Sequence, residues 1–201
     1  MQGLAASETA LLLIDVQNFV LEPRNHAARP EFYERVRVIA GPALERLLSH
    51  CRAEGIEVVY TVMENLTADG RDRSLDYKLS GFNIAKDSPG ALIPAPFQPR
   101  GDEIIFRKSS ACLWHSTNAA YVLRNMGIRN VFCTGFLTDQ CVEQTLRAGT
   151  SLGFRMACVP DACAANTNTR HRSALARVKT ICQFPSADEF CTPPRKQPAL
   201  S

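Results

Sequence analysis

Short apolar segments recur along this chain, and segments with helical spacing alternate with them. The first, 9–16, is an almost continuous apolar run, which is typical of a strand buried on both faces of a parallel sheet. Similar runs follow at 56–63, 103–106, 130–134, 154–159 and 180–183. Helical patterns cover 35–53, 116–126, 139–152 and 169–179. The alternation predicts an α/β fold with a doubly wound, mostly parallel six-stranded Rossmann-like sheet and helices on both faces.

The composition favours one domain and excludes several classes of partner. A chain of 201 residues that is 45% apolar can bury one sizeable core, so we expect a single domain over 1–201 with a disordered tail at 193–201. The net charge of +3 and the scattered basic residues do not support a nucleic-acid partner. No apolar stretch approaches the roughly 20 residues of a membrane span. The first residues lack the pattern of a secretion signal, so the expected location is the cytoplasm.

The 8 cysteines do not form short-spaced pairs. Without a Cys-x-x-Cys motif, neither a zinc site nor a thioredoxin-type site is supported. Several cysteines lie inside apolar runs, where Cys behaves as a small hydrophobic residue. We therefore expect reduced core cysteines. The alternative, a thiol redox sensor, requires a second thiol close enough to resolve a sulfenic acid.

Cys141 stands apart from the other cysteines because of its position. It follows the strand 130–134 after a tight turn and lies in the first turn of the helix 139–152. A helix N-terminus carries unpaired N–H groups and a partial positive charge, which favour a thiolate and can stabilise an oxyanion. The sequence therefore suggests a nucleophile, with inert packing as the alternative.

Two further polar residues close predicted strands. Asp15 ends the first apolar run, and Lys108 follows the strand 103–106. Because ligands gather outside the carboxyl ends of parallel strands, we expect Asp15, Lys108 and Cys141 to meet at one edge of the sheet. Taken singly, Asp15 could serve a turn and Lys108 could be a solvated surface charge.

Three motifs together resemble the isochorismatase-like cysteine hydrolase superfamily. They are Asp15-Val16-Gln17, Arg107-Lys108-Ser109 and Gly135-x-x-Thr138-x-x-Cys141-Val142, and the resemblance extends over about 11–184. It implies hydrolysis of an amide or ureido C–N bond through a thioester, with release of ammonia or an amine. It also implies roles for three side chains: Cys141 as the nucleophile, Asp15 as the general base, and Lys108 as the cation that holds the carboxylate.

The resemblance implies further features of the site. The peptide bond Leu137–Thr138 matches the place of a non-proline cis bond, and the N–H groups of Thr138 and Cys141 match an oxyanion hole. The superfamily commonly assembles, so a homodimer or homotetramer is expected.

Within the superfamily, the polar stretch 67–78 looks closest to the branch that hydrolyses ureidoacrylate, biuret, triuret and N-carbamoyl amides. The segment 61–70 lacks the histidines of nicotinamidase-type members, so we predict no metal and no cofactor. Nicotinamidase and isochorismatase activities remain the alternatives, besides an inactive scaffold and a nucleotide-binding domain, although no Gly-x-Gly-x-x-Gly follows the first strand. A small-molecule substrate is expected, and its predicted binding residues are Gln17, Asn18, Phe19, Glu64, Asn65, Tyr77, Lys78, Trp114 and Gln183.

Overall fold

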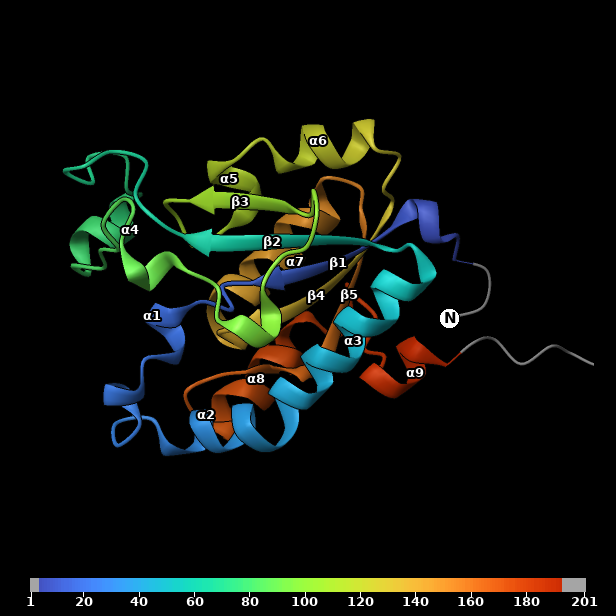
Figure 1. Ribbon diagram of the computed structural model, residues 1–201, viewed down its shortest axis with the longest axis horizontal. Helices are drawn as coiled ribbons and strands as arrows, with labels where there is room; N and C mark the ends of the chain where they lie inside the picture. The colour runs from blue at the N-terminus through green and yellow to red at the C-terminus, as the bar shows by residue number, and fades with distance from the viewer. Residues whose placement is uncertain (1–3, 193–201) are drawn as a thin grey trace, which may run out of the picture.

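The computed structural model describes residues 4–192, so the predicted disordered tail at 193–201 lies outside the described residues. The core is a five-stranded parallel sheet with the order β3-β2-β1-β4-β5 (Figure 1). Its strands are β1 (Thr9–Ile14), β2 (Glu57–Met63), β3 (Ile104–Lys108), β4 (Asn130–Phe136) and β5 (Arg155–Ala164). The predicted α/β class, parallel sheet and strand positions are confirmed.

The sixth predicted strand is wrong. Residues 180–183 form only an isolated bridge, in which Cys158 N–H donates to the Gln183 carbonyl and Gln183 N–H donates to the Met156 carbonyl. Ile181 N–H still donates to the carbonyl of Val178, the last residue of the preceding helix. The segment therefore completes a turn and reaches the sheet with a single residue.

Helices cover both faces of the sheet, as predicted, and α3 and α9 lie on the face opposite α5 and α6 (Figure 1). The buried positions of α3 recur at helical spacing, and Gly55 ends that helix in the left-handed conformation with φ of 65°. A π-helical turn over 36–40 precedes α3. The helices are α1 (Asn18–Leu21), α2 (Pro30–Arg35), α3 (Gly41–Glu54), α4 (Leu75–Leu79), α5 (Leu113–Ser116), α6 (Ala119–Asn125), α7 (Glu143–Ser151), α8 (Asn168–Val178) and α9 (Ala187–Cys191). None of the helices within 4–192 has the length and apolar character of a membrane span.

The close approach of β1 and β4 depends on Gly135. This residue has φ of 98°, and a Cβ atom placed on it would lie 2.1 Å from the Ile14 carbonyl oxygen. Only glycine tolerates both the backbone conformation and the contact. The strand order reverses between these two strands, which is where ligands bind in open α/β sheets. Gly135 thus fixes the spacing of the two strand ends at that point.

The long segment 64–100 is mostly irregular. It contains α4 and two short 3-10 turns, and most of its other residues lie outside helices and strands. In Figure 1, α1 and α4 lie beyond the arrowheads of the strands, at the carboxyl edge of the sheet. Helices α1 and α4 therefore lie next to the sheet edge that carries Asp15, Lys108 and Cys141.

Candidate active site

The structure brings Asp15, Lys108 and Cys141 together at the carboxyl edge of the sheet. Lys108 Nζ lies 2.9 Å from Asp15 Oδ2 and donates a hydrogen bond of 3.5 Å to Cys141 Sγ. Asp15 and Lys108 are 0% exposed, and Cys141 is 3% exposed. An ammonium group is thus shared between a carboxylate and a sulfur in a site largely closed to water.

The backbone and a neighbouring strand fix the carboxylate. Asp15 follows β1 with φ of 54°, a left-handed conformation that Asp tolerates better than most residues. Thr61 of β2 donates from Oγ1 to Asp15 Oδ1 at 2.7 Å and accepts from Asp15 N–H. Lys108 Nζ also donates to the Ser110 carbonyl at 3.1 Å. Each partner of the ion pair is therefore also held by a further hydrogen bond, Asp15 by Thr61 and Lys108 by the Ser110 carbonyl.

The electrostatics of the site favour a resting thiol. Burial and the Asp15 charge raise the pKa of Cys141 to about 12, although Lys108 acts to lower it. Burial would lower the pKa of Lys108, but the charges of Asp15 and Cys141 outweigh burial and raise it. The helix N-terminus favours a thiolate, but burial and the Asp15 charge outweigh that preference here. Sulfur can attack only if a base removes its proton during the reaction.

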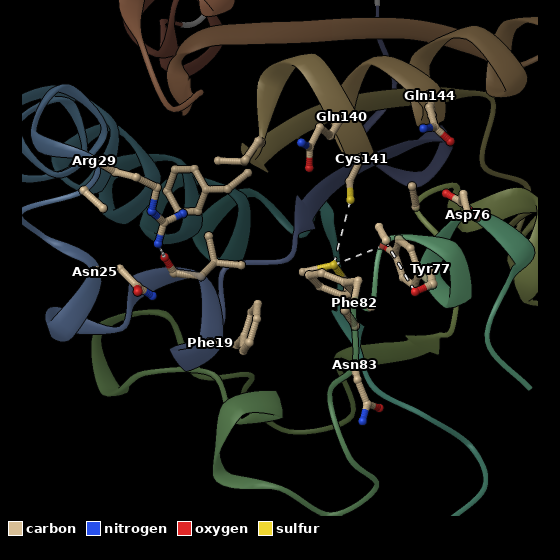
Figure 2. A pocket seen from close by; sticks show the side chains of 18 residues that line it. Phe19, Asn25, Arg29, Asp76, Tyr77, Phe82, Asn83, Gln140, Cys141 and Gln144 are labelled. Atoms are coloured by element: carbon tan, nitrogen blue, oxygen red, sulfur yellow. Dashed lines mark hydrogen bonds between the residues drawn. The ribbon is translucent and has the colours of Figure 1, made fainter. Parts of the chain in front are cut away.

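Cys141 opens onto a cavity of about 850 Å³, within the usual range for small-molecule sites (Figure 2). Its wall comes from α1 and the segment after it, from α4 and the loop that follows, and from the turn that opens α7. The lining residues are Phe19, Val20, Asn25, Ala28, Arg29, Met63, Asp76, Tyr77, Ser80, Gly81, Phe82, Asn83, Ala111, Phe136, Leu137, Gln140, Cys141 and Gln144.

The turn that carries Cys141 differs from the prediction in one detail. The non-proline cis bond joins Phe136 and Leu137, one bond earlier than predicted for Leu137–Thr138. Strand β4 runs through Phe136, so the chain turns immediately after that residue. Leu137 lies on the cavity wall beside Cys141, whereas Thr138 is buried and does not line the cavity.

A buried polar network supports this turn, and the sequence analysis did not foresee it. His171 of α8 is 4% exposed, and its Nδ1 lies 2.8 Å from Thr138 Oγ1. Its Nε2 lies 3.0 Å from Nη2 of Arg35. Arg35 also donates from Nη2 to the Pro160 carbonyl and from Nε to the Cys163 carbonyl. Arg is only a donor, so Nε2 must accept and Nδ1–H must donate to Thr138. The network ties the reactive turn to α2, β5 and α8.

Two predicted substrate-binding residues, Phe19 and Tyr77, do line the cavity. Phe82 packs against both, with ring centroids 5.3 Å from Phe19 and 4.5 Å from Tyr77. The Tyr77 hydroxyl donates to Met63 Sδ at 3.3 Å, and Met63 Sδ lies 4.0 Å from Cys141 Sγ (Figure 2). Aromatic and thioether groups thus form the wall opposite the reactive sulfur.

Three other predicted residues serve the chain itself and do not line this cavity. Gln17 is fully buried: its Nε2 donates to the carbonyls of Met63 and Gly90, and its Oε1 accepts from Met63 N–H. Glu64 accepts from Asp87 N–H and pairs with Arg107. Asn65 Nδ2 donates to Asn83 Oδ1. Their polar atoms hold the irregular segment 64–100 in place.

The other predicted substrate-binding residues do not line this cavity either. Trp114 is a core residue that donates from Nε1 to the Thr145 carbonyl and stacks on Phe154. Asn18 donates to the Pro89 carbonyl, and Lys78 is exposed away from the cavity wall. Gln183 pairs with β5 at Ala157, near the amino end of that strand and hence away from the site.

Gln140 and Gln144 line the cavity but were not predicted, although the spacing of Gln144 from Cys141 indicates its place. Gln144 follows Cys141 by three residues and therefore shares its face of the helix. A second cavity of about 510 Å³ shares Asp76, Ala111 and Gln144 with the first, and His115 lies on its wall. Arg29 and Asp76 were also missed, and they are the charged members of the main cavity wall among the described residues.

Neither a metal centre nor a resolving thiol accompanies Cys141 in the part of the chain that the structure describes. No group of three or more His, Cys, Asp or Glu side chains within 4–192 is arranged to hold a metal ion. All eight cysteines are free. Cys158 and Cys163 lie 3.8 Å apart, but both are fully buried. The sulfur that contacts Cys141 belongs to Met63, a thioether that cannot form a disulfide.

A family profile and a curated enzyme both match this chain over most of its length. The profile of the Isochorismatase domain matches residues 9–188. A ureidoacrylate amidohydrolase from Acinetobacter baylyi is 25% identical over 195 residues, which cover 89% of this chain and 80% of that protein.

Solved structures show the same fold. A cysteine hydrolase from Pseudomonas syringae pv. phaseolicola superposes with a TM-score of 0.80 at 20% identity, covering 95% of this chain and 94% of that one. An N-carbamoylsarcosine amidase from Thermoplasma acidophilum superposes with a TM-score of 0.74 at 25% identity, covering 90% of this chain and 98% of that one.

Proposed function

The chain belongs to the isochorismatase family of hydrolases, and from that premise we propose that it cleaves a C–N bond of a small linear amide or ureido compound through a thioester on Cys141. The observation that carries the proposal is the Lys108 ammonium, which contacts both the Asp15 carboxylate and the Cys141 sulfur in a buried site. The ureidoacrylate amidohydrolase and N-carbamoylsarcosine amidase relatives support a substrate of this class.

The first half-reaction transfers the acyl group to sulfur. Because the thiol has a raised pKa, Asp15 removes its proton as Sγ attacks the substrate carbonyl carbon. The C–S bond forms, and the carbonyl oxygen takes the negative charge. When the tetrahedral species collapses, the C–N bond breaks and the proton on Asp15 passes to the leaving nitrogen. The products are a thioester on Cys141 and a neutral amine or ammonia.

The second half-reaction regenerates the thiol. Water attacks the thioester carbonyl carbon while Asp15 takes one of its protons. The C–S bond then breaks, and that proton returns to sulfur. Lys108 remains an ammonium throughout, since its raised pKa keeps it charged beside Asp15. It holds the carboxylate in place and balances the negative charge that moves between carboxylate and sulfur.

Backbone N–H groups of the reactive turn are the proposed oxyanion hole. The sequence pointed to Thr138 and Cys141, and the lining of the cavity favours Leu137 in place of Thr138. The N–H groups of Gln140 and Val142 donate to the Leu137 carbonyl and so tie down this turn. A turn held in this way presents its donors without reorganisation when the anion forms.

The proposal is tested by an ammonia-release screen over biuret, triuret, ureidoacrylate, N-carbamoyl amino acids and nicotinamide. We expect turnover of at least one ureido compound, and its loss in Cys141→Ala and Cys141→Ser. Cys112→Ala is the matched control, because it removes another buried thiol that does not line the main cavity.

Two results would overturn parts of the proposal. Turnover retained by Cys141→Ala would exclude the thioester. A clear preference for nicotinamide would exclude the linear ureido substrate while leaving the nucleophile in place.

A further inference from the structure

The main cavity is electrically polarised along its length. Among the described residues on its wall, the only cation is Arg29 and the only anion is Asp76. Figure 2 shows Arg29 and Asp76 on opposite sides of the cavity, with Cys141 between them. Lys108 and Asp15 compensate each other's charge in a buried ion pair, and neither residue lines the cavity. A bound molecule therefore meets a positive group at one end and a negative group at the other.

Arg29 is held by neutral groups. Its Nη2 donates to the Val20 carbonyl at 2.8 Å and to the Tyr33 hydroxyl at 3.2 Å. Its guanidinium carbon lies 4.8 Å from the centroid of the Phe32 ring and 5.4 Å from that of Tyr33. No ion pair between residues of the described range involves Arg29. Aromatic rings thus fix the guanidinium plane, and its charge has no carboxylate counterpart.

The remaining donors of this guanidinium suit a carboxylate. Arg has five N–H groups in a rigid fork, and the hydrogen bonds of Arg29 to described residues involve Nη2 alone. Nε and Nη1 are left for the bidentate geometry that carboxylates accept. Arg24 of the same segment differs: its side chain is 78% exposed and lies 3.6 Å from Glu22. Within residues 4–192, Arg29 is the one half-buried cation on the wall of the main cavity.

We propose that Arg29 is the subsite for a carboxylate of the substrate, an inference that rests on the proposed hydrolysis of ureido compounds. It assigns the enzyme to N-carbamoyl and ureido carboxylic acids in preference to neutral biuret, triuret or alkylureas. The acid end lies at Arg29, the carbonyl at Cys141, and the terminal NH2 group toward Asp76. Asp76 repels a carboxylate in the reverse orientation, so the two charges together select one direction of binding.

Two ligands that differ only in their terminal group test this assignment. N-carbamoyl-β-alanine and propylurea share the carbamoyl group and the chain, but a methyl group replaces the carboxylate in propylurea. Calorimetric titration into Cys141→Ala measures binding without turnover. We expect the acid to bind roughly 10- to 100-fold more tightly than propylurea, the size of a charge-assisted hydrogen-bonded pair. Arg29→Gln in the same background should abolish that difference by weakening only the acid.

Two control variants separate charge from architecture. Tyr33→Phe removes a hydrogen-bond partner of Arg29 and keeps the cation, so the preference for the acid should persist. Arg24→Gln removes an exposed charge of the same segment and should leave both affinities unchanged. Equal affinity of the two ligands for Cys141→Ala would overturn the assignment, as would an equal loss of both in Arg29→Gln.

Kinetics with otherwise unmodified enzyme distinguish this inference from the proposed function. Arg29→Gln should raise KM for the acid by the same factor, and it should change kcat/KM for a neutral ureido substrate by a much smaller factor. Turnover of neutral ureas without a preference for acids would refute the carboxylate subsite alone. Tight, Arg29-dependent binding of the acid without any turnover would refute the hydrolysis alone.

Discussion

Acid should weaken this fold through one histidine, His171. Its imidazole is held between Arg35 and Thr138, with Nδ1–H donating to Thr138 and Nε2 accepting from Arg35. Burial and the charges of Arg35 and Arg172 lower the pKa of His171 from 6.5 to about 4, and Asp139 only partly opposes them. A proton on Nε2 would also face the Arg35 guanidinium directly. The native state therefore keeps this side chain neutral.

The size of the effect follows from linkage. In the unfolded chain His171 takes up a proton as the pH falls through 6.5, whereas in the native state it resists until about pH 4. The unfolded state binds more protons in this window, so stability falls as the pH falls. Lowering the pKa of His171 from 6.5 to about 4 corresponds to roughly 3 kcal/mol of stability, since a tenfold change in proton affinity is worth about 1.36 kcal/mol. Above pH 6.5 both states are neutral, and His171 adds no pH dependence.

Urea unfolding at pH 7 and pH 4.5 measures this effect, with Trp114 fluorescence as the signal. His171→Asn does not titrate and keeps an amide donor for Thr138. Carboxylates titrate alike in both proteins, so the difference between their losses isolates His171. The wild type should lose roughly 2 kcal/mol more than the variant between the two pH values. Equal losses would show that His171 does not resist protonation in the native state. The exposed His26→Asn should behave as the wild type does.

Three further outcomes are expected. Gly135→Ala should lower the free energy of unfolding in urea by roughly 3 kcal/mol or more, because its Cβ would lie 2.1 Å from Ile14 O. Gly153→Ala, with open space around its Cβ, should lower it by only about 1 kcal/mol. Equal losses in the two variants would contradict this. The rate of Cys141 alkylation by iodoacetamide, followed by mass spectrometry, should rise up to about tenfold per pH unit through pH 9, since the pKa of the thiol is about 12. A rate that levels off below pH 8 would show a resting thiolate. Asp15→Asn removes a charge that raises this pKa, so alkylation at pH 8 should become faster while turnover falls by roughly 100-fold or more; retained turnover would exclude Asp15 as the base.

The parallel sheet explains why the residues of the candidate site could be found from the sequence. Asp15, Lys108 and Cys141 each follow an apolar run, and the carboxyl ends of parallel strands meet at one edge. The prediction needed only strand order and strand ends, which hydrophobic patterning determines well. The strand predicted at 180–183 is absent because this short segment, with only two apolar residues, completes the turn after a helix instead.

Substrate contacts were harder to predict because a polar residue can serve either a ligand or the chain. The irregular segment 64–100 buries backbone N–H and C=O groups that need partners. Gln17 and Glu64 supply some of them, so their polar groups are already used. Arg29 and Asp76 reach the cavity from segments about fifty residues apart in sequence. Only the tertiary structure shows that they face the same space.

The protonation state of Cys141 also required the structure. A helix N-terminus favours a thiolate by only about 1 kcal/mol. Complete burial and a neighbouring carboxylate act in the opposite direction, and together they raise the pKa to about 12. The sequence shows the helix but shows neither the depth of the sulfur nor its contact with Asp15. The chemistry consequently shifts from a preformed thiolate to proton removal during attack.

The central claim is covalent catalysis by Cys141 with Asp15 as its base. Its most direct test is mass spectrometry of the enzyme quenched in acid during turnover of a ureido substrate, followed by peptide mapping. We expect an added acyl or carbamoyl group on the peptide that contains Cys141, and neither adduct nor turnover in Cys141→Ala. An adduct on a different residue, or full turnover by Cys141→Ala, would contradict it.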